Sequence, residues 1–495
     1  MPLTRRQILK LTALSALPSL AAAGAWAEIS PTSSERALAE FRKGFAGQVL
    51  LPGDTAYEGA RMAASFNPTT DRHPRLIARC ANEADVLRAV AFGRENSIEI
   101  AVRAGGFDVL GASVGDGMVI DLSRLKAIGI DRQRGMAQVQ GGVRSGELGG
   151  AADAQGLAAV LGCHPSIGVT GLTLGGGLGW LAGKYGAACD NLVAANVVTA
   201  GGATLRASET ENPDLYWALK GGGGNFGIVT SVELRLHPLE RVFGGVAAYR
   251  GDIAAFLRFY RDFMKDAPDE LTVELSIRQL KVPTLLATAC WIGEPAEGER
   301  VLRPLRAFGP PTADAMGIVA YSHLIDRPGP DFGRRLFGDG PRPAPPPPPT
   351  GPYHDYWRGG SLPDLGDGAA ERIASAVSSA PPGWSIGLGH YIHGQVSRAT
   401  AAESALPRRT GQLTYFFDAG WHDPALGDRA MAWVDDSHAA MKAYSSPGTY
   451  INYLSSDEPS AIEASYAQNY RRLASIKRKY DPDNVFHRNR NIVPL

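Results

Sequence analysis

The sequence predicts an α+β protein built of two domains. Three observations lead to this class. The chain has 495 residues, more than one hydrophobic core usually encloses. From residue 74 onward, apolar runs of strand length alternate with amphipathic runs of helix length. The pattern then changes to longer alternating strands, so the chain divides into a first domain at 28–241, with its core at about 72–241, and a second domain at 242–445.

A targeting segment precedes the first domain. TRRQILKL carries twin arginines at 5–6, and the apolar stretch LTALSALPSLAAAGAWA follows it. The AWA at 25–27 fits a small-residue cleavage site, so residues 1–27 are predicted to be a twin-arginine signal peptide. Pro18 interrupts the apolar stretch, and no stable membrane anchor is expected. Export would place the mature protein in the periplasm or outside the cell; the alternative is a basic tail without a targeting role.

Charge and cysteine content give no support for several kinds of partner. Lys plus Arg number 50, and Asp plus Glu also number 50. A balanced chain offers no excess of basic groups for nucleic acid or an anionic membrane. The four cysteines match no zinc-binding spacing, so no metal site is predicted. The sequence leaves open whether any disulfide forms.

The elements of the first domain follow one another closely. Asn82 is suited to cap a helix, because its side chain can accept a hydrogen bond from the first turn. The pair Gly201-Gly202 predicts the turn of a hairpin. Helices are expected at 82–97 and 145–157, and strands at 75–80, 98–106, 118–131, 135–142, 191–208 and 225–238.

The second domain combines alternating strands with amphipathic helices. LTVELSIRQL at 271–280 and LTYFFDAGW at 413–421 are the clearest strands. The proline-rich run at 341–352 fits neither helix nor strand and predicts an exposed extended loop, with a proline-rich recognition motif as the alternative. The remaining segment, 446–495, predicts a helix over NYRRLASIKRKY that ends at Asp481-Pro482.

Two glycine-rich segments carry the first functional signal. They are VRAGGFD at 102–108 and GCHPSIGVTGLTLGGGLG at 162–179. The glycines at 105–106 and at 175–177 can present backbone N–H groups to an anion without interference from side chains. Two such cradles in one domain predict a pyrophosphate-bridged dinucleotide. A Rossmann site is not expected, because the glycines do not open a tight βαβ unit and no ribose-binding acid follows at the usual distance; glycines that only serve tight turns are the alternative.

Longer motifs identify a family. The chain contains AVRAGGFDVLGAS, VIDLSRLKAI, GVTGLTLGGGLGWLAGKYGAACDNL, VVTAGG, DLYWALKGGGGNFGIVT and YINY, in this order. These resemble flavoproteins with a PCMH-type FAD-binding domain, within the berberine bridge enzyme-like group. The resemblance covers nearly the whole mature chain. It implies a vanillyl-alcohol-oxidase-like fold, in which both ends of the chain (28–241 and 446–495) form the FAD domain and a central substrate domain lies over the flavin.

The resemblance also implies which residues contact FAD. The loop at 102–108 and the segment at 166–179 would surround the pyrophosphate and the flavin, and the NFGIVT strand would approach the adenine side. The residues carried over are Arg103, Ala104, Gly105, Gly106, Phe107, Asp108, Cys163, His164, Ser166, Gly168, Gly171, Thr173, Gly175, Gly176, Gly177, Gly179, Asn225, Gly227, Ile228, Val229, Asn452 and Asn489.

The chain departs from the family at the two positions of covalent flavin attachment. Relatives use a His directly after the paired glycines, and here that residue is Phe107. They also use a Cys four residues before the G-V-x-G motif, and here that residue is His164, with Cys163 one place too early. The sequence therefore favours noncovalent FAD. A bond from Cys163 after a local backbone shift and a bond from His164 remain the alternatives.

The resemblance implies an FAD-dependent oxidoreductase acting on a small molecule. Oxidation of a C–H bond next to O or N, in an alcohol, sugar or amine, requires hydride transfer to flavin N5 and removal of a proton. Tyr450, the first residue of YINY, matches the family tyrosine that faces the substrate, although a neutral phenol needs activation to act as a base. His390 and His393 are the other candidate bases, each with a structural role as the alternative.

The electron acceptor is left open between O2 and another oxidant. In the family, the residue before the glycine of G-V-x-G lines the pocket where O2 meets the flavin, and here it is Ile167. A branched side chain at this position can slow the access of oxygen, so a dehydrogenase with poor use of O2 is the alternative to an oxidase. A non-catalytic protein that only binds flavin is the third interpretation.

Overall fold

The computed structural model describes residues 31–62, 71–108, 110–325, 354–407 and 413–495. The predicted signal peptide and the proline-rich loop lie outside these residues. The chain forms two compact units, Met1–Phe45 and Ala46–Leu495, and helix α2 (Pro31–Lys43) belongs to the first. Within the described part of the chain, no helix has the length and apolar character needed to cross a bilayer.

The second unit begins with a small sheet of four strands in the order β1-β2-β4-β3. β2 and β3 both run parallel to β4, while β1 is antiparallel to β2. Asn82 caps helix α4 by accepting a hydrogen bond from the Asp85 amide at 2.9 Å, as the sequence predicts. The elements of this part are β1 (Gln48–Leu50), α3 (Tyr57–Met62), β2 (Leu76–Arg79), α4 (Glu83–Glu95), β3 (Ile100–Arg103) and β4 (Met118–Asp121).

A five-stranded antiparallel sheet follows, in the order β5-β6-β10-β8-β9. Its strands are β5 (Ile128–Asp131), β6 (Met136–Gln140), β8 (Leu192–Val198), β9 (Thr204–Ser208) and β10 (Ile228–Arg235), and β7 (Leu157–Ala158) pairs with β11 (His237–Pro238) beside it. The helices of this part are α5 (Ser145–Asp153), α6 (Val169–Leu174), α7 (Ala182–Tyr185), η2 (Ala188–Asn191) and α8 (Pro213–Leu219).

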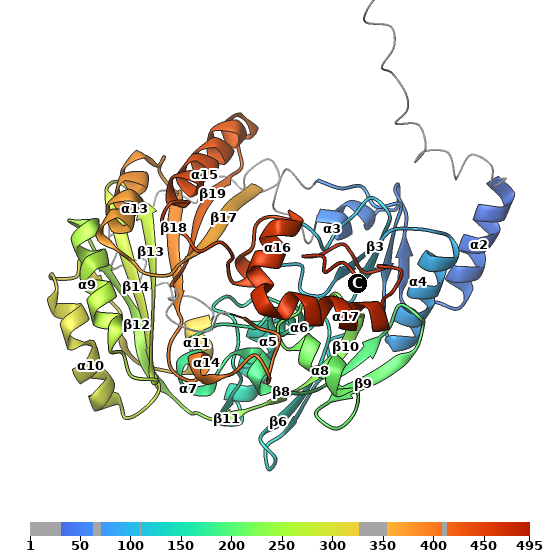
Figure 1. The fold of residues 1–495 in the computed structure, drawn as a ribbon, viewed down its shortest axis with the longest axis horizontal. Coiled ribbons are helices and arrows are strands. Elements are labelled where there is room, and N and C mark those ends of the chain that lie inside the picture. The colour runs from blue at the N-terminus through green and yellow to red at the C-terminus, as the bar shows by residue number, and fades with distance from the viewer. Residues whose placement is uncertain (1–30, 63–70, 109, 326–353, 408–412) are drawn as a thin grey trace, which may run out of the picture. The chain divides into compact units, whose positions relative to one another are not determined.

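The central part of the chain builds an antiparallel sheet of eight strands, with β15-β12-β14-β13-β18-β19-β17 in sequence across it and β16 paired to β12. Helices α9, α10, α13 and α15 lie along the same face of this sheet (Figure 1). The strands are β12 (Val242–Tyr249), β13 (Leu271–Gln279), β14 (Pro283–Trp291), β15 (Ala313–Asp314), β16 (Gly317–Val319), β17 (His354–Leu362), β18 (Ser385–Tyr391) and β19 (Leu413–Trp421). The helices are α9 (Ile253–Lys265), α10 (Pro295–Ala307), α11 (Tyr321–Ile325), α13 (Asp367–Ser379), α14 (Gln395–Arg398), η3 (Pro424–Leu426) and α15 (Gly427–Met441).

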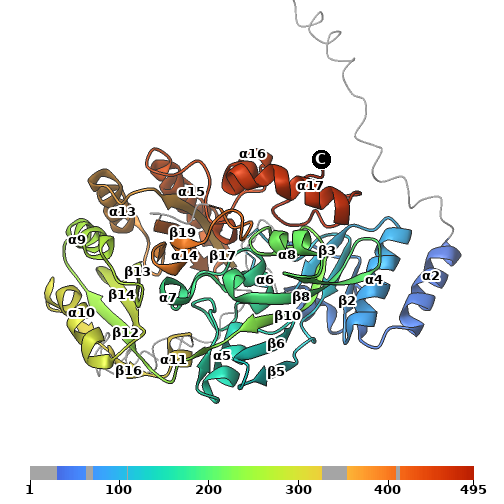
Figure 2. The same cartoon turned by 60° about the horizontal axis from the view of Figure 1, so that its bottom comes forward.

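The last segment of the chain returns to the glycine-rich part. It consists of η4 (Ile451–Tyr453), α16 (Pro459–Tyr466), η5 (Ala467–Asn469) and α17 (Tyr470–Tyr480). Figure 2 shows α17 beside α8, and the two helices are in contact. α17 ends at Tyr480, directly before the predicted stop at Asp481-Pro482.

The buried apolar side chains form two large hydrophobic cores. One gathers side chains mainly from 137–242 and 450–492, and the other gathers side chains from 243–441. The C-terminal segment therefore packs with the first part of the chain and not with the sheet that precedes it in sequence. Both cores belong to the compact unit Ala46–Leu495, and the division of the chain near residue 242 stays a prediction.

A buried ion pair fixes the C-terminal segment. The Lys477 ammonium donates to Asp481 Oδ2 and to the Asn225 carbonyl oxygen, each at 2.7 Å, and to the Phe486 carbonyl oxygen at 3.1 Å. Both side chains are fully buried. Asp481 also accepts hydrogen bonds from the amides of Val485 and Phe486. The pair thereby links α17 both to the residues that follow it and to the loop before β10.

We expect Lys477→Met to lower the free energy of unfolding by about 3–5 kcal/mol, because it leaves the Asp481 carboxylate buried without its cation. Equilibrium urea denaturation measures this. Lys479→Met is the matched control: Lys479 pairs with Asp214 at 2.7 Å but is largely exposed, so its loss should cost less than about 1 kcal/mol. Equal effects of the two substitutions would contradict the role given to the buried pair.

Candidate functional site

The loop after β3 approaches the segment before α6 very closely. A Cβ atom on Gly105 would lie 2.4 Å from the backbone of Gly168, so only glycine fits there. Gly106 has φ +75°, in the left-handed region. Arg103 anchors the start of the loop, because its buried guanidinium donates to Asp121 at 2.8 Å and to the Ala60 carbonyl at 2.7 Å. The two segments that the sequence predicts to contact FAD therefore lie side by side.

The triple glycine at 175–177 does not form the predicted anion cradle. Its amides donate to Gly171 O, Thr173 O and the Tyr450 hydroxyl, at 3.4, 3.0 and 2.8 Å. These residues follow the C-terminal end of α6, where carbonyl groups and not amides point outward. The glycines are needed for close packing instead: a Cβ on Gly175 would lie 1.9 Å from Asn452 Oδ1.

Polar groups without partners occur in the connection after β3, in α6 and in the C-terminal tail. The amides of Gly106 and Phe107 have no acceptor within the described ranges. Side-chain oxygens that are buried and unpaired among the described residues belong to Ser113, Thr170, Asn489 and Asn491. Buried polar atoms are nearly always satisfied, so these groups fit a bound ligand that is rich in hydrogen-bonding atoms, as FAD is.

Hydrogen bonds hold the C-terminal tail against the connection that follows β3. Arg490 donates to Asp108 Oδ1 at 2.5 Å, and Arg488 donates to the Val114 carbonyl at 2.9 Å. Asn225 accepts from the Ile492 amide and donates to the Arg490 carbonyl. Asn225 therefore positions the tail that carries Asn489.

The other predicted FAD residues divide into two groups. Ala104, Ser166 and Gly171 lie in the segments already described, and a side chain on Gly171 would meet open space. The second group is packed within the protein: Thr173 donates to the Val169 carbonyl, and a Cβ on Gly179 would lie 1.8 Å from the Leu161 carbonyl oxygen. Gly227, with φ +156°, packs against Val197 and precedes the buried Ile228 and Val229 of β10.

The two positions of covalent attachment in the family face each other. The rings of Phe107 and His164 lie 5.4 Å apart, and Phe107 is 48% exposed although it is apolar. Cys163 points elsewhere: its Sγ lies 3.0 Å from Glu274 Oε1 on β13. Burial and the Glu274 carboxylate raise the pKa of Cys163 well above its usual range, which keeps the group a thiol.

Tyr450 is tightly held. Its hydroxyl oxygen accepts hydrogen bonds from the amides of Gly177 and Leu178, at 2.8 and 3.1 Å, and from Asn452 Nδ2 at 2.8 Å. Asn452 also donates to the Leu172 carbonyl. Burial raises the pKa of Tyr450 to about 12, so the group is a neutral phenol at neutral pH.

One face of the eight-stranded sheet is covered by the helices α9, α10, α13 and α15, and we call the opposite face the open face. The open face carries polar and aromatic side chains next to Tyr450. Strict alternation along β19 places Tyr415 and Phe417 in the core beneath the helices and Thr414 and Phe416 on the opposite face. Phe416 contacts Tyr453 at a centroid distance of 5.7 Å, and Tyr453 contacts Tyr450 at 5.5 Å. The YINY segment thus joins the sheet face to the glycine-rich segment.

A cluster of three reactive groups lies at this junction. Glu274 Oε1 is 2.8 Å from His390 Nδ1 and 3.0 Å from Cys163 Sγ. Glu274 was not predicted as a site residue. The available signal was a single acidic residue on the alternating strand LTVELS, and sequence alone does not say what an outward-facing carboxylate meets.

His393 and Ile167 take different places. His393 lies outside this cluster: it packs near Gly183, its Nδ1 is buried without a partner in the described ranges, and burial lowers its pKa. Ile167 packs against Gly162, where an added Cβ would lie 2.8 Å from Ile167 Cδ1. Its carbonyl accepts from the Ser145 amide, so its backbone is fixed.

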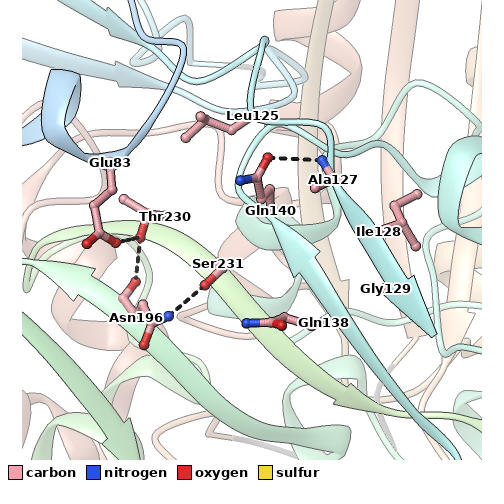
Figure 3. A pocket seen from close by; sticks show the side chains of 10 residues that line it. All are labelled: Glu83, Leu125, Ala127, Ile128, Gly129, Gln138, Gln140, Asn196, Thr230 and Ser231. Carbon is pink, nitrogen blue, oxygen red and sulfur yellow. Dashed lines mark hydrogen bonds between the residues drawn. The ribbon is translucent and has the colours of Figure 1, made fainter. Parts of the chain in front are cut away.

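A cavity of about 520 Å³ has other residues in its lining. Figure 3 shows its lining, with Thr230 donating to Glu83 at 2.6 Å and Asn196 to Ser231 at 3.0 Å. It lies on the outer face of the five-stranded sheet, since the register pairs Ser231 with Gln140 while the neighbouring Val139 and Val232 face the core. None of the predicted site residues lines it.

Two family models match the chain. The FAD binding domain model matches residues 74–208, and the berberine and berberine-like model matches residues 449–493. The chain is 30% identical over 467 residues to (R)-6-hydroxynicotine oxidase of Paenarthrobacter nicotinovorans, covering 90% of this chain and 97% of that protein. It is 28% identical over 464 residues to an uncharacterized FAD-linked oxidoreductase of Bacillus subtilis, with coverage of 91% and 97%.

Solved structures agree with this assignment. The crystal structure of 6-hydroxy-D-nicotine oxidase from Arthrobacter nicotinovorans superposes with a TM-score of 0.80 at 28% identity, covering 91% of this chain and 98% of that one. A berberine bridge enzyme variant shares the fold, with a TM-score of 0.81 at 20% identity and coverage of 93% and 99%. The predicted α+β flavoprotein fold is confirmed. The chain belongs to the berberine bridge enzyme-like family and is an FAD-dependent oxidoreductase.

Proposed function

We propose that this enzyme oxidises a C–H bond next to O or N in a small molecule, an alcohol, a sugar or an amine. The observation that carries the proposal is the arrangement at the junction of the two cores. Unpaired groups that fit FAD lie on one side, and on the other a sheet face presents an imidazole, a carboxylate and aromatic rings. Bound FAD would supply the hydride acceptor.

The protein's own residues would bind and orient the two partners. The loop at 104–108, the segment at 166–171 and Asn489 would hold FAD. Phe107 and His164 would pack against the flavin without bonding to it. Tyr450 and Asn452 would hold the glycine-rich segment in place. Because Tyr450 is a neutral phenol, it would contact the substrate without taking the substrate's proton.

An amine is the substrate class that the charges favour. Glu274 lies on the open face of the sheet, and Asp418 lies on the same face of β19 as Phe416. Burial and the neighbouring Asp418 raise the pKa of Asp355 to about 9, so Asp355 and Asp418 together keep one proton at neutral pH. The Glu274 carboxylate beside His390 suits a cationic amine. The name of the P. nicotinovorans relative, an oxidase of the amine 6-hydroxynicotine, points the same way.

We further propose export by the twin-arginine route, on the strength of TRRQILKL and the AWA at 25–27. This route carries folded proteins, which suits a chain that must acquire FAD before it leaves the cytoplasm.

The function is tested by anaerobic reduction. Purified holoenzyme is mixed with a panel of alcohols, sugars and amines, and the visible flavin absorption is followed. At least one compound, most readily an amine, should bleach it. A flavin spectrum that no compound of any class changes would favour the alternative of a protein that only binds flavin.

We expect FAD to be released when the protein is denatured by acid or heat. Phe107 has no nucleophile, and the Cys163 thiol is held by Glu274 on the sheet side. After precipitation the yellow colour should remain in the supernatant. Colour that stays with the pellet, and is absent from the pellet of Cys163→Ala, would establish a thioether instead.

Ile167 is proposed to slow the access of O2, which would make the enzyme a dehydrogenase. Ile167→Val removes one methylene at a stability cost of about 0.5–1.5 kcal/mol. Reoxidation of the reduced enzyme by O2, measured by stopped flow, should then accelerate. Ile77→Val, in a separate core, is the matched control and should leave the rate unchanged. Fast reoxidation of the unmodified enzyme without gain from valine would show that it is already an oxidase.

A further inference from the structure

His390 and Glu274 form an imidazole–carboxylate pair at the substrate side of the site. Nδ1 of His390 lies 2.8 Å from Glu274 Oε1, within ordinary hydrogen-bonding distance. The backbone amide of His390 donates to Thr414 Oγ1 at 2.7 Å. His390 is only 8% exposed, so both its ring and its backbone are fixed.

An irregularity in β18 directs the imidazole to this place. Leu388 pairs with Tyr415 and Tyr391 pairs with Leu413, with a register shift between them. Leu388 lies in the core beneath the helices. Regular alternation from Leu388 would turn residue 390 toward that core as well, whereas the shift re-aims it toward Glu274 on the open face.

The second ring nitrogen is free to react. Among the described residues, none lies within hydrogen-bonding distance of Nε2, and this atom is not sealed from open space as the Nδ1 of His393 is. The Tyr453 ring lies 6.0 Å from the His390 ring. A base oriented by a carboxylate through one nitrogen and open at the other is the arrangement that general base catalysis requires.

We propose that His390 Nε2 takes the proton from the O–H or N–H of the substrate, and that Glu274 is its positioning residue. The inference rests on the proposed function and deepens it. The substrate loses this proton to His390 and a hydride from the adjacent carbon to FAD, and the electron pair of the broken O–H or N–H bond forms the C=O or C=N bond of the product. Reoxidation by O2 or another acceptor completes the cycle.

The groups that face His390 favour this role over the alternatives. Glu274 on β13, Cys163 on the loop before α6 and Tyr453 in η4 are the titratable groups packed around it. Cys163 is a thiol that also contacts Glu274 Oε1, so it helps to hold the carboxylate in place. Tyr450 is a poorer acceptor because its oxygen already accepts three hydrogen bonds.

The first test determines which ring nitrogen of His390 carries the proton, and it requires no substrate. Holoenzyme labelled with ¹⁵N-histidine is examined by NMR, with His390→Gln used to assign the signal. The proton of the neutral ring should reside on Nδ1, and Glu274→Gln, which can offer a donor in place of an acceptor, should change this signature. A proton on Nε2 in the unmodified enzyme would overturn the proposal.

The second test measures the rate of anaerobic flavin reduction with the best substrate of the panel. His390→Gln should slow it by about 10²–10⁴-fold, the usual effect of losing a general base. Glu274→Gln should slow it by at least about tenfold. His393→Gln, a change of the same kind three residues away, should leave the rate unchanged. FAD content and melting temperature are checked for every variant.

The outcomes separate this proposal from the function on which it rests. If no compound reduces the unmodified enzyme, the proposed function fails and the base assignment fails with it. If the unmodified enzyme is reduced and His390→Gln is reduced equally fast, the function stands and His390 is not the base. If only Glu274→Gln is without effect on both rate and tautomer, the positioning role of the carboxylate is wrong.

Discussion

The hydroxyl of Tyr450 joins segments that are 273 residues apart in the chain, and the site depends on that contact. By accepting from the amides of Gly177 and Leu178, it satisfies two buried donors that follow α6. Because the adjoining Asn452 fills the space over Gly175, the C-terminal segment can dock only where side chains are missing. The glycines of this stretch are therefore explained by a second part of the protein as much as by a ligand.

The same docking places the tail against the loop after β3. Lys477, buried with Asp481, holds the end of α17 to Asn225, and Asn225 in turn binds the tail at Arg490 and Ile492. Arg490 then reaches Asp108. The C-terminal tail and the loop after β3 thus meet close to Gly106, so segments that are distant in the chain are held together there by hydrogen bonds and an ion pair.

Local features of the fold could be predicted from the sequence. The cap at Asn82, the hairpin at Gly201-Gly202 and the end of α17 follow from short-range chemistry, and all are present. The amides of Gly106 and Phe107 have no acceptor among the described residues, so the anion cradle expected at 105–106 stays a prediction. The triple glycine was misread, because its packing partner Asn452 is remote in sequence and its amides lie at the wrong end of a short helix.

The sequence identifies two candidate bases, His390 and His393, but does not distinguish between them. His390 and His393 look alike in GLGHYIHGQ, and only the register shift in β18 turns one of them toward Glu274. Such an irregularity depends on the neighbouring strands β13 and β19, so it has no local signature. Glu274 precedes His390 by 116 positions in the chain and Cys163 precedes it by 227, so no local sequence motif contains all three residues.

The central claim is that FAD lies where the loop at 104–108, the segment at 166–171 and the tail at Asn489 meet, with its flavin beside Phe107 and His164 and open toward His390. An electron-density map of the purified holoenzyme tests it most directly. The account predicts FAD density in contact with the amides of Gly106 and Phe107, no continuous density that would indicate a covalent bond from the flavin to a side chain, and an open path from the flavin to His390. Density continuous with Cys163, or FAD bound in the cavity on the outer face of the five-stranded sheet, would contradict it.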